Sequence, residues 1–194
     1  MPFGLKAWCV IKTENFESFL DVWNKLPRSA HAFLPSKDEC NPGNLGSLLS
    51  QTALFRYDAK YQLTILFVGS EMERLSGLGS TGENYYSLIS DDLKLSMNFH
   101  HKTIFNTPCG AYVGDVITPR NGNSYLFETM QFPVCDSNGE VKFLLAYGYG
   151  RRDTGNLGER DVSDRTGQHI RDLHYMDLGE GAPDNCIIDF EMHP

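Results

Sequence analysis

Two adjacent histidines, His100 and His101, are the clearest candidates for a chemical role in this chain. The residues around them place apolar side chains at four-residue steps, with Met97 before His101 and Phe105 after it. This spacing predicts a helix with His101 on its apolar stripe. Imidazole is a good axial ligand of haem iron, so His101 is a candidate haem ligand if an aromatic cavity lies beside the helix. The alternative is a structural histidine near a helix end.

Acid–base catalysis is a second chemistry that the sequence leaves open. His101, Asp115 and Glu128 could serve as acid and base if burial shifted a pKa towards neutrality. Asp115 lies in the middle of an expected strand, and the simpler interpretation places it on the outward face of an edge strand. A zinc site made of His100, His101 and Cys109 is not favoured, because no fourth ligand stands at metal spacing.

Motifs for nucleotide, flavin and hydrolytic chemistry are missing from the sequence. Gly77, Gly79 and Gly82 spell G-x-G-x-x-G, but this run follows an expected helix instead of opening one after a strand. Cys109 lacks the Asn-Cys-Arg-Phe pattern of flavin-binding photosensors. No G-x-S-x-G, H-E-x-x-H or kinase signature occurs. We therefore expect a chain without catalytic output.

Composition limits the partners and the compartment. The formal net charge of −8 disfavours nucleic acid and anionic membrane surfaces, because both are bound through Lys and Arg. No apolar run approaches the roughly 20 residues that span a bilayer, and the N-terminus lacks the features of a signal peptide. The five scattered cysteines form no C-x-x-C pair, which favours reduced thiols. We expect a cytoplasmic protein that binds neither nucleic acid nor membrane.

Three regions must position these side chains. Residues 1–52 form a helical leader, residues 53–151 form the core, and residues 152–194 form a polar extension. The extension still holds apolar residues, which indicates that it returns to the body of the protein. A hydrophobic fraction of 41% suffices for one core and argues against disorder.

The core has a recognisable order of elements. Five runs indicate strands: residues 53–57, 63–68, 111–117, 125–134 and 141–149. After the second run, a capping box at Ser70 and Glu73 begins a short helix that Gly77 ends, and Ser90 begins a longer one. Asn-Gly turns join the last three strands into a meander. The predicted fold class is therefore α+β, a five-stranded antiparallel sheet with short crossover helices and an N-terminal helix.

The leader contains an amphipathic helix. Its apolar residues lie at three- and four-residue steps and are Phe16, Phe19, Leu20 and Trp23, with Pro27 marking the end. If the crossover helices cover one face of the sheet, this stripe must pack on the other face or on a second subunit. We expect a homodimer in which these four apolar residues take part in dimerisation.

The element order resembles that of a PAS domain, and the details are similar to a stand-alone bacterial PAS-like family in which an N-terminal helix precedes the sensor core. The residues that carry the resemblance are Trp23 and Pro27, residues 66–70, Gly77 and Gly82, residues 132–134, and residues 177–183. The family usually shows Gly-Thr where this chain has Gly69-Ser70. The resemblance implies a sensory or protein-interaction module that signals to a partner protein by contact, and it implies no common ligand.

In a PAS-type sheet the expected ligand pocket lies between the inner face and the crossover helices, as an apolar cavity with few polar groups. A helix at this place supplies the haem ligand in haem-binding PAS sensors. The residues expected at the pocket are Phe67, Met97, His101, Phe105, Phe127, Thr129 and Tyr147. Side chains that simply fill the space are the simpler interpretation. The sequence thus predicts a sensor with a small apolar ligand and no cofactor, with a haem-binding sensor and a small acid–base enzyme as alternatives.

Overall fold

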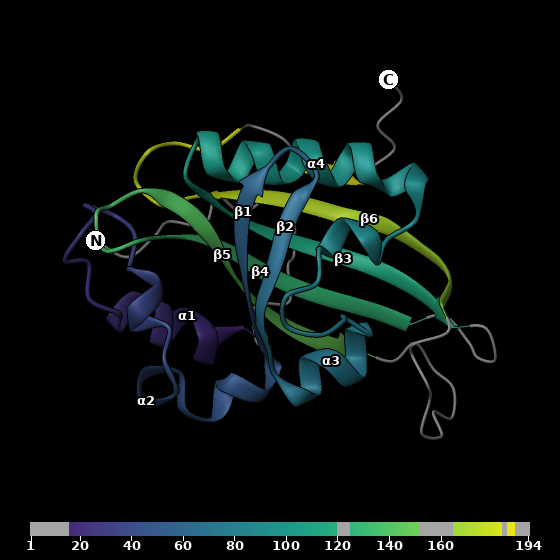
Figure 1. Cartoon of the computed structure of the whole chain (residues 1–194), viewed down its shortest axis with the longest axis horizontal. Coiled ribbons are helices and arrows are strands. Elements are labelled where there is room, and N and C mark those ends of the chain that lie inside the picture. Colours follow the sequence, from purple (N-terminus) through teal and green to yellow (C-terminus); the bar gives the residue numbers. More distant parts are fainter. Residues whose placement is uncertain (1–15, 120–124, 152–164, 184–185, 189–194) are drawn as a thin grey trace.

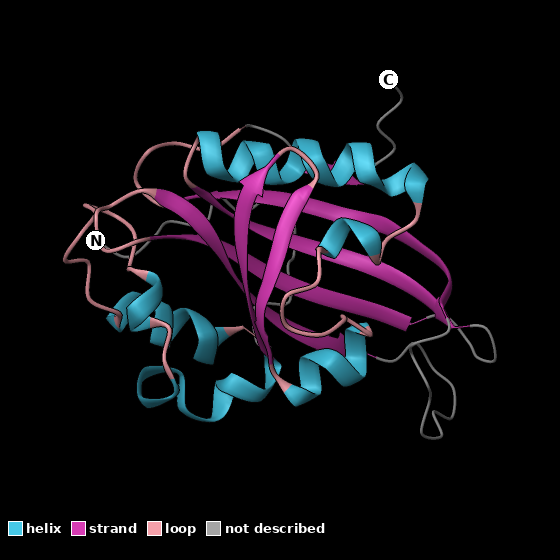
Figure 2. Cartoon of the chain, in the orientation of Figure 1, coloured by secondary structure: helices cyan, strands magenta, loops and turns pink. Residues whose placement is uncertain are grey.

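The computed structural model describes residues 16–119, 125–151, 165–183 and 186–188. The predicted α+β class is confirmed, because helices and one antiparallel sheet make up the molecule (Figures 1 and 2). The helices are α1 (Glu17–Lys25), α2 (Pro42–Leu45), α3 (Ser70–Ser76) and α4 (Asp91–Asn106), with short 3-10 helices η2 (Lys37–Glu39), η3 (Gly46–Gln51) and η4 (Tyr85–Ser87). None of the helices described is long and apolar enough to cross a membrane.

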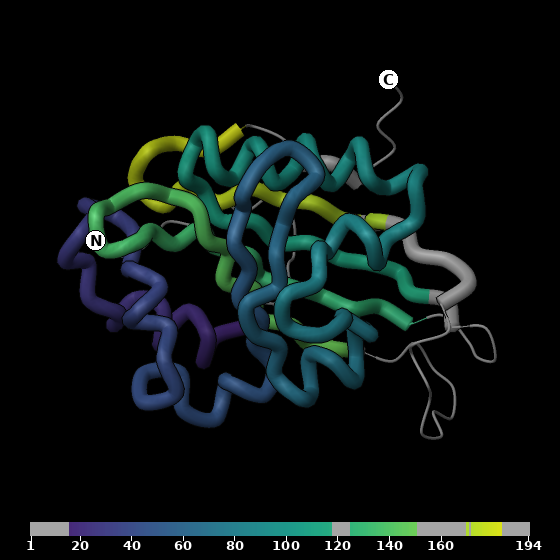
Figure 3. The backbone as a smooth tube through the Cα atoms, in the orientation of Figure 1, coloured from purple at the N-terminus to yellow at the C-terminus, as the bar shows by residue number. Residues whose placement is uncertain are grey.

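The sheet has seven strands in the order β2-β1-β5-β4-β3-β6-β7. They are β1 (Thr52–Ala59), β2 (Gln62–Val68), β3 (Cys109–Pro119), β4 (Tyr125–Cys135), β5 (Val141–Arg151), β6 (Arg165–Asp177) and β7 (Cys186–Ile188). All neighbours pair antiparallel, and the chain reaches β3 from β2 through the helical crossover, which Figure 3 traces.

The predicted number of five strands is therefore too low by β6 and β7. Both come from the polar extension and add to the sheet beyond β3. The pairing of β3 with β6 has a register shift, since Gly114 faces Asp172 while the next residue, Asp115, faces Ile170. This irregularity breaks the alternation of apolar and polar residues by which a strand is read from sequence. β3 thus lies inside the sheet, and Asp115 is not on an edge strand as expected.

Each face of the sheet carries its own apolar cluster. On the helical face, residues such as Phe55, Ile65 and Phe127 pack against Met97 and Ile104 of α4, and we call this the inner cluster. On the opposite face, the leader packs against alternate residues of the same strands. We call this the leader cluster; its larger members are Phe16, Phe19, Trp23, Met130, Phe132, Phe143 and Tyr147. Because the sheet is covered on both faces, every residue of β4 is buried.

The leader helix is buried by its own chain. Phe16 and Phe19 have no exposed surface, and Trp23 is 2% exposed. The ring of Phe19 stacks on Tyr147 with centroids 5.1 Å apart, and Trp23 meets the ring of Phe132 edge-on at 4.7 Å. The expectation that these side chains form a dimer contact is corrected, since the outer face of the sheet already covers them. Half-buried Leu20 packs against the same cluster.

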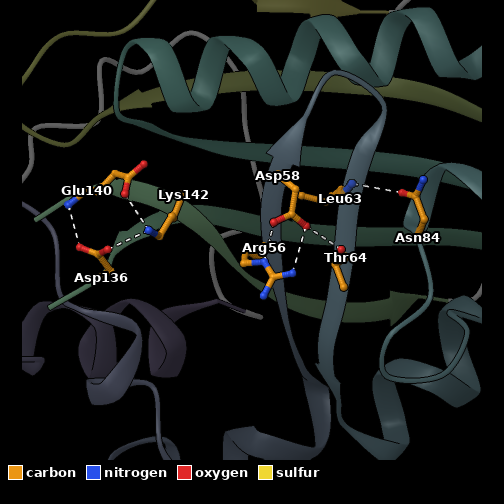
Figure 4. A network of polar contacts seen from close by, with 8 residues as sticks. All are labelled: Arg56, Asp58, Leu63, Thr64, Asn84, Asp136, Glu140 and Lys142. Atoms are coloured by element: carbon orange, nitrogen blue, oxygen red, sulfur yellow. Dashed lines mark hydrogen bonds and ion pairs between the residues drawn. The ribbon is translucent and has the colours of Figure 1, made fainter. Parts of the chain in front are cut away.

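Polar contacts lie at two hairpins of the sheet, β1–β2 and β4–β5 (Figure 4). In the turn between β4 and β5, Asp136 Oδ1 accepts the backbone N–H groups of Asn138 and Glu140 at 2.8 and 3.0 Å, and Lys142 pairs with the same carboxylate at 2.8 Å. Gly139 adopts φ +84°, so this predicted Asn-Gly turn is confirmed. The other predicted Asn-Gly turn, residues 120–123, lies outside the described residues.

Candidate functional site

A small cavity lies within the inner cluster, between the sheet and the helical crossover. Its volume is about 50 Å³. The apolar part of its wall includes Phe55, Leu63, Met72, Ile117, Phe127, Leu144 and Ala146. The residues with polar atoms on the wall are Ser76, Tyr85, His101, Asp115, Thr129 and Gln131. An apolar enclosure with a few polar groups has the composition of a small-molecule site.

The structure brings three of the expected pocket residues to this wall: His101, Phe127 and Thr129. Met97 is buried in the inner cluster without reaching the cavity. Phe105 is half-buried and stacks on Tyr57, with ring centroids 4.8 Å apart.

Tyr147 and Phe67 are not on the cavity wall, for reasons of strand geometry. Tyr147 pairs with Met130 and belongs to the leader cluster, so it faces the side of the sheet away from α4. Phe67 pairs with Leu54, which also packs against the leader cluster. On β5, Leu144 and Ala146 face the cavity, because side chains alternate between the two faces of a strand.

The orientation of His101 is set by Tyr86, the buried residue of η4. The Tyr86 hydroxyl lies 2.7 Å from His101 Nδ1, and His101 is 2% exposed. Within the described chain this hydroxyl has no other acceptor, so its proton is donated to Nδ1. The imidazole proton then resides on Nε2. Burial, with the neighbouring His100, holds the pKa of His101 well below its usual range, so the ring is neutral at physiological pH.

Asn84 holds Tyr86 in place by joining η4 to β2. Its Oδ1 accepts the backbone N–H groups of Leu63 at 3.1 Å and Tyr86 at 3.2 Å, while its Nδ2 donates to the carbonyl of Tyr61 at 2.9 Å. Figure 4 shows the Asn84 side chain directed at the backbone of β2. The His101 ring is therefore fixed through two residues to the sheet.

A chain of hydrogen bonds leads from the cavity wall to β6. His100 Nε2 lies 3.0 Å from Gln131 Oε1, and His100 Nδ1 lies 3.1 Å from the hydroxyl of Tyr175. Gln131 Nε2 donates to Thr129 Oγ1 at 3.0 Å. One consistent assignment has Tyr175 donating to His100, His100 to Gln131, and Gln131 to Thr129. Burial lowers the pKa of His100 to about 4, so this ring too is neutral.

The residues present do not fit haem. Pockets for ligands of drug size measure about 300–1,000 Å³, and a porphyrin needs a site of that order. This cavity has a volume of about 50 Å³.

The three residues considered for acid–base catalysis, His101, Asp115 and Glu128, do not lie together at one site either. Glu128 points to the leader side of the sheet, where its Oε1 accepts a hydrogen bond of 2.6 Å from the hydroxyl of Tyr112. His101 lies on the opposite side. Asp115 does share the cavity wall with His101, and it is 9% exposed. In the parts of the chain that the structure describes, no three His, Cys, Asp or Glu side chains are grouped to hold a metal ion.

Sequence reasoning missed Tyr86, Gln131 and Ala146. A usable signal was the series Leu144, Ala146 and Gly148, whose small members alternate with the aromatic residues of β5. A Cβ on Gly148 would come within 2.6 Å of the Phe127 ring and 2.8 Å of Met72 Sδ. Small residues on one face of a strand mark the place where neighbouring side chains approach closely.

Comparison with solved structures finds partial likenesses, including three with TM-scores below 0.5. The PAS domain of BvgS from Bordetella pertussis is 14% identical with a TM-score of 0.41, and the match covers 55% of this chain and 82% of that one. A variant of RsLOV is 13% identical with a TM-score of 0.42, covering 75% of this chain and 73% of that one. VqmA of Vibrio cholera, solved with ligand and DNA, is 16% identical with a TM-score of 0.40, and the match covers 54% of this chain and 49% of VqmA.

Comparison with curated proteins gives no match. A family model described as "PAS domain" matches residues 11–147, which is more than half of the chain and includes α1 to α4 and β1 to β4. The chain belongs to the PAS domain family, whose members serve as sensory and interaction modules.

Proposed function

We propose that this chain senses a small molecule in the cavity beneath α4 and passes the signal to a partner protein by contact, with no catalytic output of its own. One observation carries the proposal: the His101 N–H, fixed by Tyr86, shares an otherwise mainly apolar wall with Thr129 and Gln131. A ligand atom that accepts a hydrogen bond from this ring would fix the orientation of the ligand in the cavity.

The cavity sets the class of ligand. One water needs about 10–15 Å³ of such space, so the cavity holds only a few non-hydrogen atoms unless side chains move. Apolar walls favour an apolar body, and His101 favours one hydrogen-bond acceptor on it. The ligand that we propose is therefore a compact, mainly apolar molecule with one acceptor.

The hydrogen-bond chain supplies a route from the cavity to β6. A ligand that bonds to Thr129 competes with Gln131, and Gln131 is bonded to His100, which contacts Tyr175 of β6. Ligand binding can shift a conformational equilibrium only through different contacts in the two states. This competition is such a difference, and it connects the proposed sensing event to the strand that follows the core.

The location that we propose is the cytoplasm. Cys40, Cys109 and Cys135 are free thiols in the described part of the chain. Burial raises the pKa of Cys40 and Cys109 to about 12, which keeps them protonated and unreactive. Thiols of this kind suit a reducing compartment.

Filling the cavity is expected to expel the ligand. Ala146→Leu adds three carbons to the wall, while Ala59→Leu makes the same change at an exposed end of β1 and is the matched control. We expect native mass spectrometry of the purified protein to show an added mass on the unmodified chain and on Ala59→Leu, and to show none on Ala146→Leu. Bound mass that persists on Ala146→Leu, or that is missing from the unmodified chain, contradicts the proposal.

A further inference from the structure

The outward side of α4 carries apolar side chains that remain exposed among the residues that the structure describes. Leu95 is 42% exposed and Phe99 is 47% exposed, and Leu88, just before the helix, is 36% exposed. The inward side of the same helix is buried in the inner cluster, so the helix is already anchored. Large apolar side chains that lie together on a surface mark an interaction site.

Leu95 and Phe99 belong to a regular stripe that we call the α4 seam. Its four residues follow each other at steps of three, four and three within α4, and all are exposed: Asp92, Leu95, Phe99 and Lys102. This spacing keeps residues on one side of a helix and is the spacing along which two helices pack against each other. The seam therefore fits another helix better than it fits a flat surface or a small molecule.

The α4 seam is complementary to itself. Its members lie symmetrically about position 97, so an antiparallel pair of α4 helices would place Leu95 beside Phe99 of the partner subunit. The same symmetry would place Asp92 beside Lys102 of the partner subunit, which pairs opposite charges at both ends. A two-fold interface requires this kind of match, because each surface patch meets its own copy.

The two charges of the seam have no ion-pair partner within the described part of the chain. The neighbouring Lys94 pairs with Asp91 at 2.6 Å, whereas Asp92 and Lys102 form no ion pair among the residues that the structure describes. Asp92 and Lys102 are ten residues apart, or about 15 Å along the helix, so they cannot pair within one copy. A second copy can satisfy both.

From this placement we propose that two copies of the chain associate through α4, with the helices antiparallel about a two-fold axis at position 97. The leader residues that the sequence predicts at a dimer interface are buried within one chain. The proposed dimer therefore uses a different surface, that of α4. Stable interfaces bury about 1,200–2,000 Å², and one pair of helices of this length falls below that range. The association is thus weak and depends on protein concentration.

The apolar part of the seam is tested by sedimentation velocity over a concentration series. We expect the unmodified full chain to form dimers, and we expect Leu95→Gln with Phe99→Gln to raise the dissociation constant at least about tenfold, as for central apolar contacts. Phe33→Gln is the matched control, because Phe33 is 41% exposed but lies outside α4. Circular dichroism checks that each variant is folded.

Exchanging the charges tests the antiparallel geometry. Asp92→Lys places two lysines at each charge pair and Lys102→Asp places two aspartates there, so each single change should weaken the dimer. The double change D92K/K102D restores opposite charges only between copies, and the dissociation constant should return towards that of the unmodified chain. Within one copy the double change replaces an acid by a base in the first turn of α4, which opposes the helix dipole, so folding stability falls while association recovers.

Three outcomes would each overturn the proposal. The unmodified chain could stay monomeric at all concentrations, or the dimer could survive the change at Leu95 and Phe99. The D92K/K102D variant could also associate no better than the variants with single changes.

Discussion

Trp23→Ala is expected to lower the free energy of unfolding by about 3–5 kcal/mol, because it removes a large aromatic side chain from a closed apolar cluster. Trp23 is 2% exposed, meets the Phe132 ring at 4.7 Å and lies under the Arg28 guanidinium at 5.6 Å. The cavity that remains cannot collapse easily, since the backbone on the opposite side is a paired strand. Urea denaturation followed by fluorescence and circular dichroism measures the loss.

A matched change and the protein concentration separate the explanations for this loss. Phe33→Ala removes another aromatic ring, but one that is 41% exposed, so it should cost less than about 1 kcal/mol. Because Trp23 is buried by its own chain, the loss should not vary with protein concentration, as it would if a second subunit covered the ring. A loss below about 1 kcal/mol for Trp23→Ala, or a loss that grows on dilution, contradicts the packing of the leader on its own sheet.

The sequence predicts most elements of the core but not the faces that they present. The sequence places the helix starts at Ser70 and after Ser90 correctly, but the predicted capping box of Ser70 and Glu73 is wrong: Gly69 is the N-cap of α3, and neither Gly69 nor Ser90 makes a side-chain capping hydrogen bond. The Asn138-Gly139 turn follows from the conformation that Gly139 adopts readily. On β5 both alternating sets of residues are apolar. The local sequence pattern therefore does not predict that the aromatic residues of β5, which include Tyr147, face the leader.

The candidate site shows the same division between local and long-range information. His101 and Thr129 can be placed from helix and strand periodicity, because each lies well inside one element. Tyr86 and Gln131 cannot be assigned in this way, since their roles depend on contacts with His101 and His100, which are 15 and 31 residues away along the chain. The sequence does not predict β6 as a strand, because β6 is rich in charged residues and its register with β3 is irregular. Tertiary pairing, which a single sequence does not report, decides these positions.

Acid is expected to destabilise the protein in the range from pH 6.5 down to about pH 4. His100 has no exposed surface, and burial lowers its pKa from 6.5 to about 4 although Gln131 opposes the shift. Below pH 6.5 the unfolded chain takes up a proton on this ring and the folded chain does not, so stability falls as the pH falls. At about 1.4 kcal/mol per pH unit, His100 alone accounts for a loss of about 3 kcal/mol across this window. His101 adds to it, because its pKa is lowered as well.

Urea denaturation between pH 7.5 and pH 4.5 tests this dependence above the range in which most carboxylates take up protons. His100→Gln with His101→Gln removes these two titrating rings and should make the dependence on pH clearly shallower, while His174, whose pKa is also lowered by burial, keeps a remaining slope. That variant is expected to be less stable at neutral pH, because Tyr86 and Tyr175 lose buried partners at about 1–3 kcal/mol each. The slope against pH, not the stability at one pH, is therefore the diagnostic quantity.

The matched control for the slope is His31→Gln, which removes a half-buried histidine whose Nε2 lies 3.4 Å from Glu180, outside the site. It should keep the acid slope of the unmodified chain. A double variant that keeps the slope, or an unmodified chain whose stability is flat between pH 7.5 and pH 4.5, would show that the pair is not held neutral in the fold. The oriented His101 N–H that supports the ligand proposal would then lose its basis, because a protonated ring donates from both nitrogens and cannot accept the Tyr86 hydroxyl proton.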